Sequence, residues 1–279
     1  MRILLIAMDI RIDAFREELE FSYDLIILAG GILLDHHGKP LKVELKEDGT
    51  KVTDVDRLVS DLVSPSFEAR FPGYAVVDEE RKEDNRRYTS ADCLFIDPLD
   101  DTSGYIRGGD DFGVIFGRTH GNTPVWGMSF KPAKKEVAYA VKGHGAYLVK
   151  DGVTARLEPS ESEEIHVLVS RSRRGEELDA ILKDLNPDSV AYMGGSLKII
   201  EVAKGDSTVF ICPQKSTMHL WDLCGPSVFL EESGGRISDL HRDSFDYRNP
   251  DTANHNGVVA ARNEGVYRKV FDRIGHLYA

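Results

Sequence analysis

The chain has 279 residues, enough for one large domain or two packed subdomains, and carries 35 Lys and Arg against 47 Asp and Glu. The net charge of −12 argues against a general nucleic-acid-binding protein, which needs cations facing the phosphate backbone. A small phosphorylated substrate stays compatible with this charge if divalent cations lie between the two negative partners.

The cysteines and the apolar segments predict a cytoplasmic protein. The three cysteines form no C-x-x-C pair, which is typical of reduced thiols. The apolar stretch at residues 1–8 is too short for a secretory signal, and the run at 25–34 is too short to span a bilayer. We therefore expect no membrane partner, no nucleic-acid polymer, and a monomer or homodimer.

The first half begins with helices and continues with strands. Residues 9–37 are predicted to be helical, 42–53 polar and turn-like, and 54–63 helical again, with Pro65 as a breaker. Short apolar runs then predict an antiparallel sheet with hairpin-like connections. The predicted strands are residues 74–77, 93–96, 112–116, 125–130, 136–141 and 145–149.

Strands and helices alternate in the second half. The predicted strands are residues 165–169, 209–212 and 257–262, and the predicted helices are 175–185, 196–204, 222–233 and 266–274. Ser196 is the expected N-cap of its helix, and Gly205 is expected to end it. We thus predict an α+β subdomain at 1–157 and an α/β subdomain at 158–279 that packs on it.

The densest chemical signal is the segment from Phe95 to Thr102. A predicted strand delivers Asp97 at its end, and Pro98 is expected to turn the chain so that Asp100 faces the same point. The Leu99 carbonyl can face this point too. Oxygen-only ligation suits Mg²⁺, although an ordinary surface turn rich in Asp and Pro is the simpler alternative.

Three further carboxylates have both an ordinary and a functional interpretation. Glu79 follows a predicted strand but begins a charge run, so a solvated turn explains it equally well. Asp222 and Asp56 lie near helix starts, where Asp complements the helix dipole. The functional interpretation is that Glu79 and Asp222 join the same metal cluster.

The order of these motifs resembles the lithium-sensitive, Mg²⁺-dependent phosphatase superfamily, whose members include inositol monophosphatases, fructose-1,6-bisphosphatases and 3′(2′),5′-bisphosphate nucleotidases. The family pattern is V-T-x-x-D, G/S-E-E, D-P-[IL]-D-G-T, and W-D with a trailing G-G. The matching segments here are Val52 to Asp56, Asp78 to Glu80, Asp97 to Thr102, and Trp221-Asp222 with Gly234-Gly235.

The resemblance implies a fold, a cofactor and residue roles. The fold would be the layered αβαβα sandwich of the inositol monophosphatase and fructose-1,6-bisphosphatase type, an α/β (α+β) architecture. Two or three Mg²⁺ ions would be bound by Glu79, Asp97, Asp100, Asp222 and the Leu99 carbonyl. Thr102, hydrogen-bonded to Asp56, would help Glu79 orient the attacking water, so Thr102, Asp56 and Glu79 are the predicted catalytic residues.

The subfamily is indicated by a segment of the second half. Gly194 to Lys198 resembles the G-S-S-L-K segment of bacterial 3′(2′),5′-bisphosphate nucleotidases, which predicts adenosine 3′,5′-bisphosphate as the substrate. Gly195, Ser196 and Lys198 would then contact the substrate, with Lys198 facing its second phosphate. The alternative is that Ser196 is only an N-cap and Lys198 a solvated residue.

Asp101 departs from the family pattern, which has Gly at this position. Family loops contact the substrate phosphate here, so Asp101 and Thr102 are predicted substrate-binding residues. The Asp101 carboxylate either points to solvent, tunes a metal, or impairs catalysis. An inositol monophosphatase, a sugar bisphosphatase, and a catalytically silent metal- or phosphate-binding homologue therefore stay open as alternatives.

Overall fold

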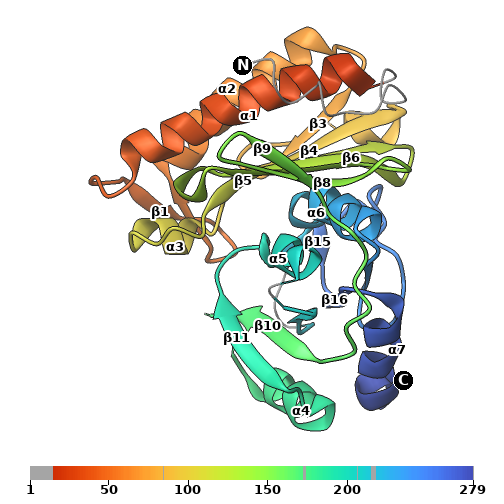
Figure 1. Cartoon of the computed structure of the whole chain (residues 1–279). Helices are drawn as coiled ribbons and strands as arrows, with labels where there is room; N and C mark the ends of the chain where they lie inside the picture. The colour runs from red at the N-terminus through yellow and green to blue at the C-terminus, as the bar shows by residue number, and fades with distance from the viewer. Residues whose placement is uncertain (1–14, 84, 172–173, 206, 215–217, 279) are drawn as a thin grey trace.

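Five layers of helices and sheets alternate in the computed structural model, which describes residues 15–83, 85–171, 174–205, 207–214 and 218–278 (Figure 1). A pair of helices covers one face of a seven-stranded sheet, and two helices separate this sheet from a five-stranded sheet. Two more helices cover the outer face of the second sheet. The predicted αβαβα sandwich is confirmed.

The seven-stranded sheet has its strands in chain order, from β3 to β9. The β3–β4 pair is parallel and every later pair is antiparallel, so the predicted antiparallel sheet is correct except at this edge. The strands are β3 (Ala75–Asp78), β4 (Asp92–Asp100), β5 (Gly113–His120), β6 (Thr123–Lys131), β7 (Glu136–Val141), β8 (Gly145–Lys150) and β9 (Val153–Arg156).

Helices α1 (Arg16–His36) and α2 (Asp54–Arg70) pack on the outer face of this sheet. The helix predicted from residue 9 is confirmed from Arg16, and residues 9–14 lie outside the described part. The predicted break at Pro65 is wrong, because α2 continues through it. Phe67 is fully buried, with ring centroids 5.2 Å from Phe21 and 5.8 Å from Phe116, and this packing stabilises the last turns.

A β-hairpin replaces the turn-like segment predicted at 42–53. Strand β1 (Val43–Leu45) pairs with β2 (Lys51–Thr53) in antiparallel register. The hairpin closes because the Lys46 N–H donates to the Thr50 carbonyl at 2.8 Å, and the Asp48 side chain accepts from the Thr50 N–H at 2.9 Å. The prediction failed because local polar bonds, rather than apolar alternation, hold this hairpin together.

The five-stranded sheet has the order β11-β10-β12-β16-β14. Its strands are β10 (His166–Ser170), β11 (Ser189–Met193), β12 (Val209–Cys212), β14 (Arg236–Ser238) and β16 (Val258–Ala261). Strand β11 was not predicted, because it is a largely exposed edge strand without a clear alternation of apolar residues. The predicted boundary between residues 157 and 158 falls between the last strand of the first sheet and the first strand of the second, and stays a prediction.

The remaining elements connect the two sheets. The helices are α3 (Thr102–Ile106), α4 (Glu176–Leu185), α5 (Lys198–Lys204), α6 (Leu220–Glu232) and α7 (Glu264–Ile274), with 3₁₀ turns at Arg86–Tyr88, Pro132–Lys134 and Gly275–Leu277. Short strands β13 (Met218–His219) and β15 (Ala253–Asn254) pair with each other. Within the described residues, no helix is both long and apolar enough to cross a membrane.

Three glycines let α6 lie directly against the first sheet. A side chain on Gly117 of β5 would place its Cβ 2.3 Å from the Gly225 nitrogen, and one on Gly127 of β6 would reach within 2.3 Å of the Gly225 carbonyl oxygen. Backbone therefore touches backbone at this crossing. This contact fixes the N-terminus of α6, which carries Asp222, over the end of β4, which carries Asp97.

Candidate active site

Two carboxylates of the site come from an irregular end of β4. In a regular strand, residues three apart point to opposite faces. Here the pairing with β5 shifts between Asp97, which lies opposite Ile115, and Asp100, which lies opposite Gly113. This bulge turns both carboxylates to the same side. The predicted turn at Pro98 is therefore wrong, since the strand continues to Asp100, although the two carboxylates do meet.

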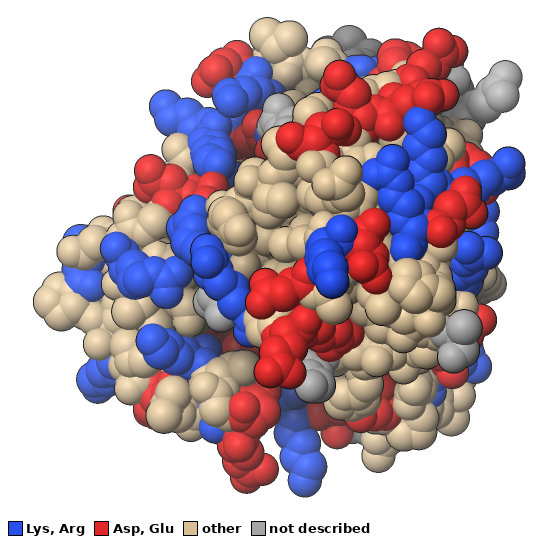
Figure 2. All heavy atoms as spheres, turned by 90° about the horizontal axis from the view of Figure 1, so that it is seen from below, with Lys and Arg blue, Asp and Glu red and all other residues tan. Residues whose placement is uncertain are grey.

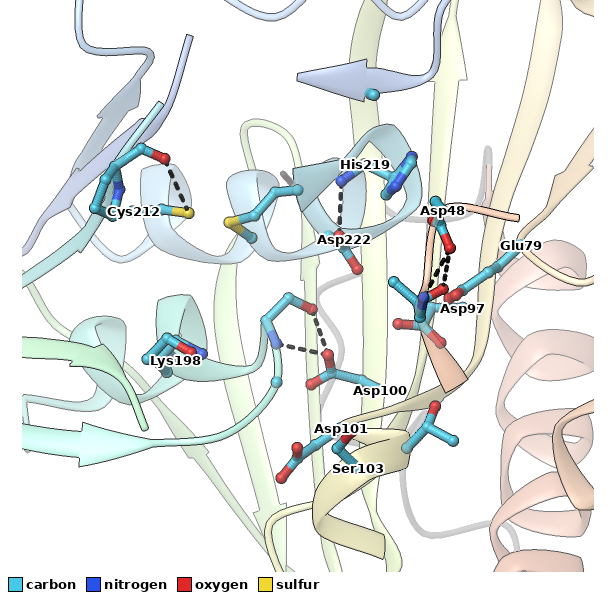
Figure 3. Close-up of a pocket in the computed structure, with 18 of the residues that line it drawn as sticks. Asp48, Glu79, Asp97, Asp100, Asp101, Ser103, Lys198, Cys212, His219 and Asp222 are labelled. Carbon is cyan, nitrogen blue, oxygen red and sulfur yellow. Dashed lines mark hydrogen bonds between the residues drawn. The ribbon is translucent and has the colours of Figure 1, made fainter. Parts of the chain in front are cut away.

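A third carboxylate reaches this point from α6. One oxygen of Asp222 accepts the His219 backbone N–H at 2.7 Å, which closes a capping box at the helix start. Oxygens of Asp97, Asp100 and Asp222 all lie within 4.8 Å of one another (Figure 3). Asp222 thus serves both interpretations at once, since it caps its helix and joins the cluster.

The surroundings of Asp97 suit a divalent cation. Asp97 is only 2% exposed, and one of its oxygens accepts the Leu99 N–H at 3.0 Å. Burial, followed by the charges of Glu79, Asp100 and Asp222, raises its pKa well above the ordinary value. Crowded buried carboxylates with oxygen-only chemistry match the ligands that Mg²⁺ prefers. Asp97, Asp100 and Asp222 could hold such an ion together, whereas Glu79 is not part of the group whose oxygens converge within 4.8 Å.

Glu79 lies at the rim of the cluster, where it is paired with a lysine from the hairpin. The Lys46 ammonium lies 2.7 Å from a carboxylate oxygen of Glu79 and 2.7 Å from one of Glu80. Burial alone would lower the pKa of Lys46, but these two ion pairs outweigh it and raise the pKa. Burial and the charge of Glu79 raise the pKa of Glu80 to about 7. Lys46 was no predicted site residue, because its segment reads as a polar turn.

Asp56 connects the start of α2 to Thr102. One Asp56 oxygen accepts both the backbone N–H and the hydroxyl of Thr53, at 2.8 and 2.5 Å. The other accepts the Thr102 hydroxyl at 3.0 Å, and the Leu99 carbonyl is a second acceptor at the same distance. The hydrogen bond expected between Thr102 and Asp56 is present. Burial raises the pKa of Asp56, although the Thr53 and Thr102 hydrogen bonds oppose the rise.

Asp101 adopts the backbone conformation that glycine would favour at this position. Its φ of 61° and ψ of 45° are left-handed, and its side chain accepts the Gly104 N–H at 3.0 Å, capping α3. A side chain on Gly194 would place its Cβ 1.9 Å from an Asp101 oxygen, so the carboxylate fits only because glycine lies opposite. Burial and the charge of Asp100 raise the pKa of Asp101 to about 6.

Ser196 binds Asp100 instead of capping α5. The Ser196 N–H and hydroxyl donate to one Asp100 oxygen at 2.5 and 2.9 Å, and the Leu197 N–H donates to the other at 3.0 Å. Helix α5 begins at Lys198 with Leu197 as its N-cap, so the predicted cap is wrong. The serine donors bind a carboxylate of the first sheet, which connects the second half of the chain to the cluster.

Lys198 and Gly195 complete this wall. Lys198 is 3% exposed, with its ammonium 5.2 Å from the centre of the Phe210 ring, so it is not a solvated surface residue. Gly195 has a φ of 65°, and a Cβ there would lie 2.2 Å from an Asp100 oxygen. Both the left-handed backbone conformation and the close contact require glycine at this position.

All the predicted site residues except Asp56 line one cavity of about 1000 Å³. Further lining residues were not predicted. His219 and Trp221 stack with ring centroids 4.5 Å apart, and Arg174 lies over the Tyr192 ring at 4.5 Å. On the face drawn in Figure 2, basic and acidic side chains are interspersed. A volume of this size fits a drug-sized metabolite.

Comparison with known proteins gives a consistent match. Residues 15–274 match the model of the inositol monophosphatase family. A 3′(2′),5′-bisphosphate nucleotidase CysQ from Haemophilus influenzae is 28% identical over 250 residues, which cover 87% of this chain and 92% of that protein. A fructose-1,6-bisphosphatase/inositol-1-monophosphatase from Aquifex aeolicus is 31% identical over 224 residues, which cover 75% and 80%.

The fold has close structural counterparts as well. The structure of an IMPase from Thermotoga maritima superimposes with a TM-score of 0.79 at 20% identity, covering 94% of this chain and 98% of that chain. At this identity the likeness concerns the fold.

Proposed function

Because this chain belongs to the inositol monophosphatase family, a family of Mg²⁺-dependent phosphatases, we propose that it hydrolyses a phosphate monoester at the Asp97–Asp100–Asp222 cluster. The first candidate substrate is adenosine 3′,5′-bisphosphate, cleaved to AMP and phosphate. The observation that carries the proposal is a buried carboxylate cluster that shares one cavity with the ammonium group of Lys198.

The residues divide the chemistry between them. Glu79, Asp97, Asp100, Asp222 and the Leu99 carbonyl would hold two or three Mg²⁺ ions. Mg²⁺ held by these residues would offset the charge on the phosphate and make a water molecule easier to deprotonate. The protein otherwise supplies position and charge, as is usual in phosphoryl transfer.

We assign Thr102 and Glu79 to the orientation of the attacking water. When the single Thr102 hydroxyl proton is donated to Asp56, the lone pairs of the Thr102 oxygen can accept a hydrogen bond from water. Asp56 stays in place because its other oxygen is held by Thr53. One Glu79 oxygen is held by Lys46, and we assign the other to the second proton of the water.

Lys198 favours a substrate with a second anionic group. A nearly fully buried ammonium at the wall of the cavity gains from an anion brought into contact with it. The CysQ relatives act on 3′(2′),5′-bisphosphate nucleotides by their description, which supports this substrate class.

Inositol monophosphate is the second candidate, and Asp101 favours it. A carboxylate that lines the cavity accepts hydrogen bonds from sugar or cyclitol hydroxyls and repels a second phosphate. A sugar bisphosphate is the third candidate, after the Aquifex aeolicus relative. A cytoplasmic location and a monomeric or homodimeric state stay predictions.

The experiment is phosphate release from adenosine 3′,5′-bisphosphate, inositol 1-phosphate and fructose 1,6-bisphosphate, each with Mg²⁺ and with a chelator. The proposal predicts chelator-sensitive release and the highest kcat/KM for the nucleotide. A higher kcat/KM for the inositol phosphate would indicate that Asp101, rather than Lys198, determines the substrate preference. Equal release with chelator would contradict a metal-dependent site.

A further inference from the structure

Asp78 is a buried carboxylate that the chemistry above does not use. It lies at the end of β3, where the family pattern has Gly or Ser, and is 4% exposed. One oxygen accepts the hydroxyls of Ser60 and Ser64 at 2.7 and 2.5 Å, and the other accepts the Glu80 N–H at 2.8 Å. We call this arrangement the Ser60–Asp78–Ser64 clamp.

The clamp attaches the end of β3 to one face of α2. Ser60 and Ser64 are four residues apart, so their side chains lie on the same face of the helix. Both are essentially inaccessible to solvent, at 1% and 0% exposed. A buried carboxylate costs free energy unless it is hydrogen-bonded, and here three donors satisfy it. The helix and the strand end are thereby held in one relative position.

The second oxygen of Asp78 fixes the turn that presents Glu79. The Glu79 N–H donates to the Ile96 carbonyl at 3.2 Å, beyond the last residue of β3. The Arg81 N–H then returns to the Asp78 carbonyl at 3.1 Å, while the Asp78 side chain holds the Glu80 N–H. Hydrogen bonds on both sides of Glu79 thus determine the direction in which its side chain leaves the backbone.

A second contact holds the Glu79 side chain itself. Its ion pair with Lys46 joins side chains that are each 22% exposed, and Lys46 comes from the two-stranded hairpin. The two contacts act on different parts of Glu79, since Lys46 holds a carboxylate oxygen while the turn closed by Asp78 sets the position of the backbone.

Helix α2 holds two parts of the site in a fixed relation. Its first turn carries Asp56, which binds Thr102, and its next turn carries Ser60, which binds Asp78. Four residues of helix separate these contacts by about 6 Å along the axis. Glu79 and Thr102, which come from different strand ends, are thus positioned by one rigid element.

We propose that Asp78 is a positioning residue for the metal site, which acts by fixing the turn that presents Glu79 to the carboxylate cluster. The inference rests on the proposed function, since it assigns Glu79 as a metal ligand. Its test uses cation affinity in addition to activity, so that the two can fail separately.

The test compares Asp78→Ala with Asp78→Asn in the full-length protein. The alanine variant loses every clamp bond, whereas the asparagine variant keeps an oxygen for the Glu80 N–H. We expect Asp78→Ala to weaken Mg²⁺ binding, measured by calorimetry, and to lower kcat, each by about 10- to 100-fold, with KM for the substrate nearly unchanged. Asp78→Asn should recover most of both.

Two further variants separate positioning from general destabilisation. Ser64→Ala removes one donor and leaves the carboxylate in place, so it tests the clamp if Asp78→Ala does not fold. Ser238→Ala is the matched control. Ser238 ends β14 of the five-stranded sheet, away from Glu79, and makes a buried 2.7 Å hydrogen bond to Tyr267 of α7. This substitution should lower thermal stability and leave Mg²⁺ affinity unchanged.

Unchanged Mg²⁺ affinity in a folded Asp78→Ala variant would overturn the inference. Equal weakening in the alanine and asparagine variants would overturn it as well, because the turn would then not be the cause. If the wild-type protein releases no phosphate, the proposed function fails, while the Mg²⁺ affinities of the variants still decide the role of Asp78.

Discussion

Replacing Asp101 by glycine restores the family residue at the start of α3 and removes a carboxylate from the cavity. Two effects on stability oppose each other. Glycine relieves the left-handed conformation at φ 61°, which is worth about 1 kcal/mol, and it gives up the cap on the Gly104 N–H, worth a similar amount. We therefore expect the free energy of unfolding to change by less than about 1 kcal/mol.

The Asp101 carboxylate is expected to weaken phosphate binding, because two negative charges repel each other. The pKa of Asp101 is raised to about 6, and bound cations lower it, so the carboxylate is ionised at pH 7.5. We take a phosphate bound at the first amides of α3 to lie about 6 Å from the Asp101 carboxylate, which caps the third amide. At an effective dielectric constant of about 40, one pair of unit charges at this distance costs about 1.4 kcal/mol, or tenfold in affinity.

The assay is inhibition by inorganic phosphate together with KM for the substrate, at pH 7.5 with Mg²⁺. Asp101→Gly should lower the inhibition constant of inorganic phosphate and the KM of the substrate, each by about tenfold. Asp101→Asn is the matched control, since it keeps the cap and tolerates the left-handed conformation but has no charge, and it should share the gain. Weaker phosphate binding in both variants would show that the Asp101 carboxylate supports phosphate binding instead of opposing it.

Three further predictions concern packing, specificity and pH. Gly225→Ala places a Cβ 2.3 Å from the Phe116 carbonyl oxygen, and should cost about 1–3 kcal/mol in chemical denaturation. Lys198→Met should raise KM for adenosine 3′,5′-bisphosphate by about tenfold and leave KM for inositol 1-phosphate unchanged in steady-state assays. Without metal, the melting temperature should fall as the pH rises from 5 to 8, because burial raises the pKa of Glu80 to about 7, and the folded state then binds more protons than the unfolded state. Added Mg²⁺ should remove this dependence of the melting temperature on pH. A melting temperature that rises with pH in chelator would contradict the raised pKa of Glu80.

The sequence was sufficient where chemistry and spacing are local. The segment from Asp97 to Thr102, the helix pattern before it and the strand runs after it predicted the first sheet and the approach of Asp97 and Asp100 to each other. The bulge that turns both carboxylates to one side was not predictable, because it depends on the register with β5. Local propensity also misled, since Pro65 normally breaks a helix, yet packing of Phe67 outweighs that cost.

Contacts between distant segments explain the other differences. Ser196 precedes an apolar helical pattern, which is typical of an N-cap, but its donors bind Asp100, which lies 96 residues earlier. The contacts of Lys46 with Glu79, and of Asp78 with Ser60 and Ser64, join elements whose adjacency no local pattern reveals. For Asp222 the local sequence offered a helix-capping role and membership of the cluster alike, and only the resemblance to a family favoured the cluster.

Phosphate release should depend on Mg²⁺ held by the carboxylates of Asp97, Asp100 and Asp222. The most direct test is phosphate release by the wild-type protein and by Asp97→Asn, each with Mg²⁺ and with a chelator. We expect chelator-sensitive release by the wild type, and a loss of roughly two to three orders of magnitude in a variant that stays folded. Mg²⁺-dependent turnover at the wild-type rate by folded Asp97→Asn would show that this carboxylate does not hold the metal.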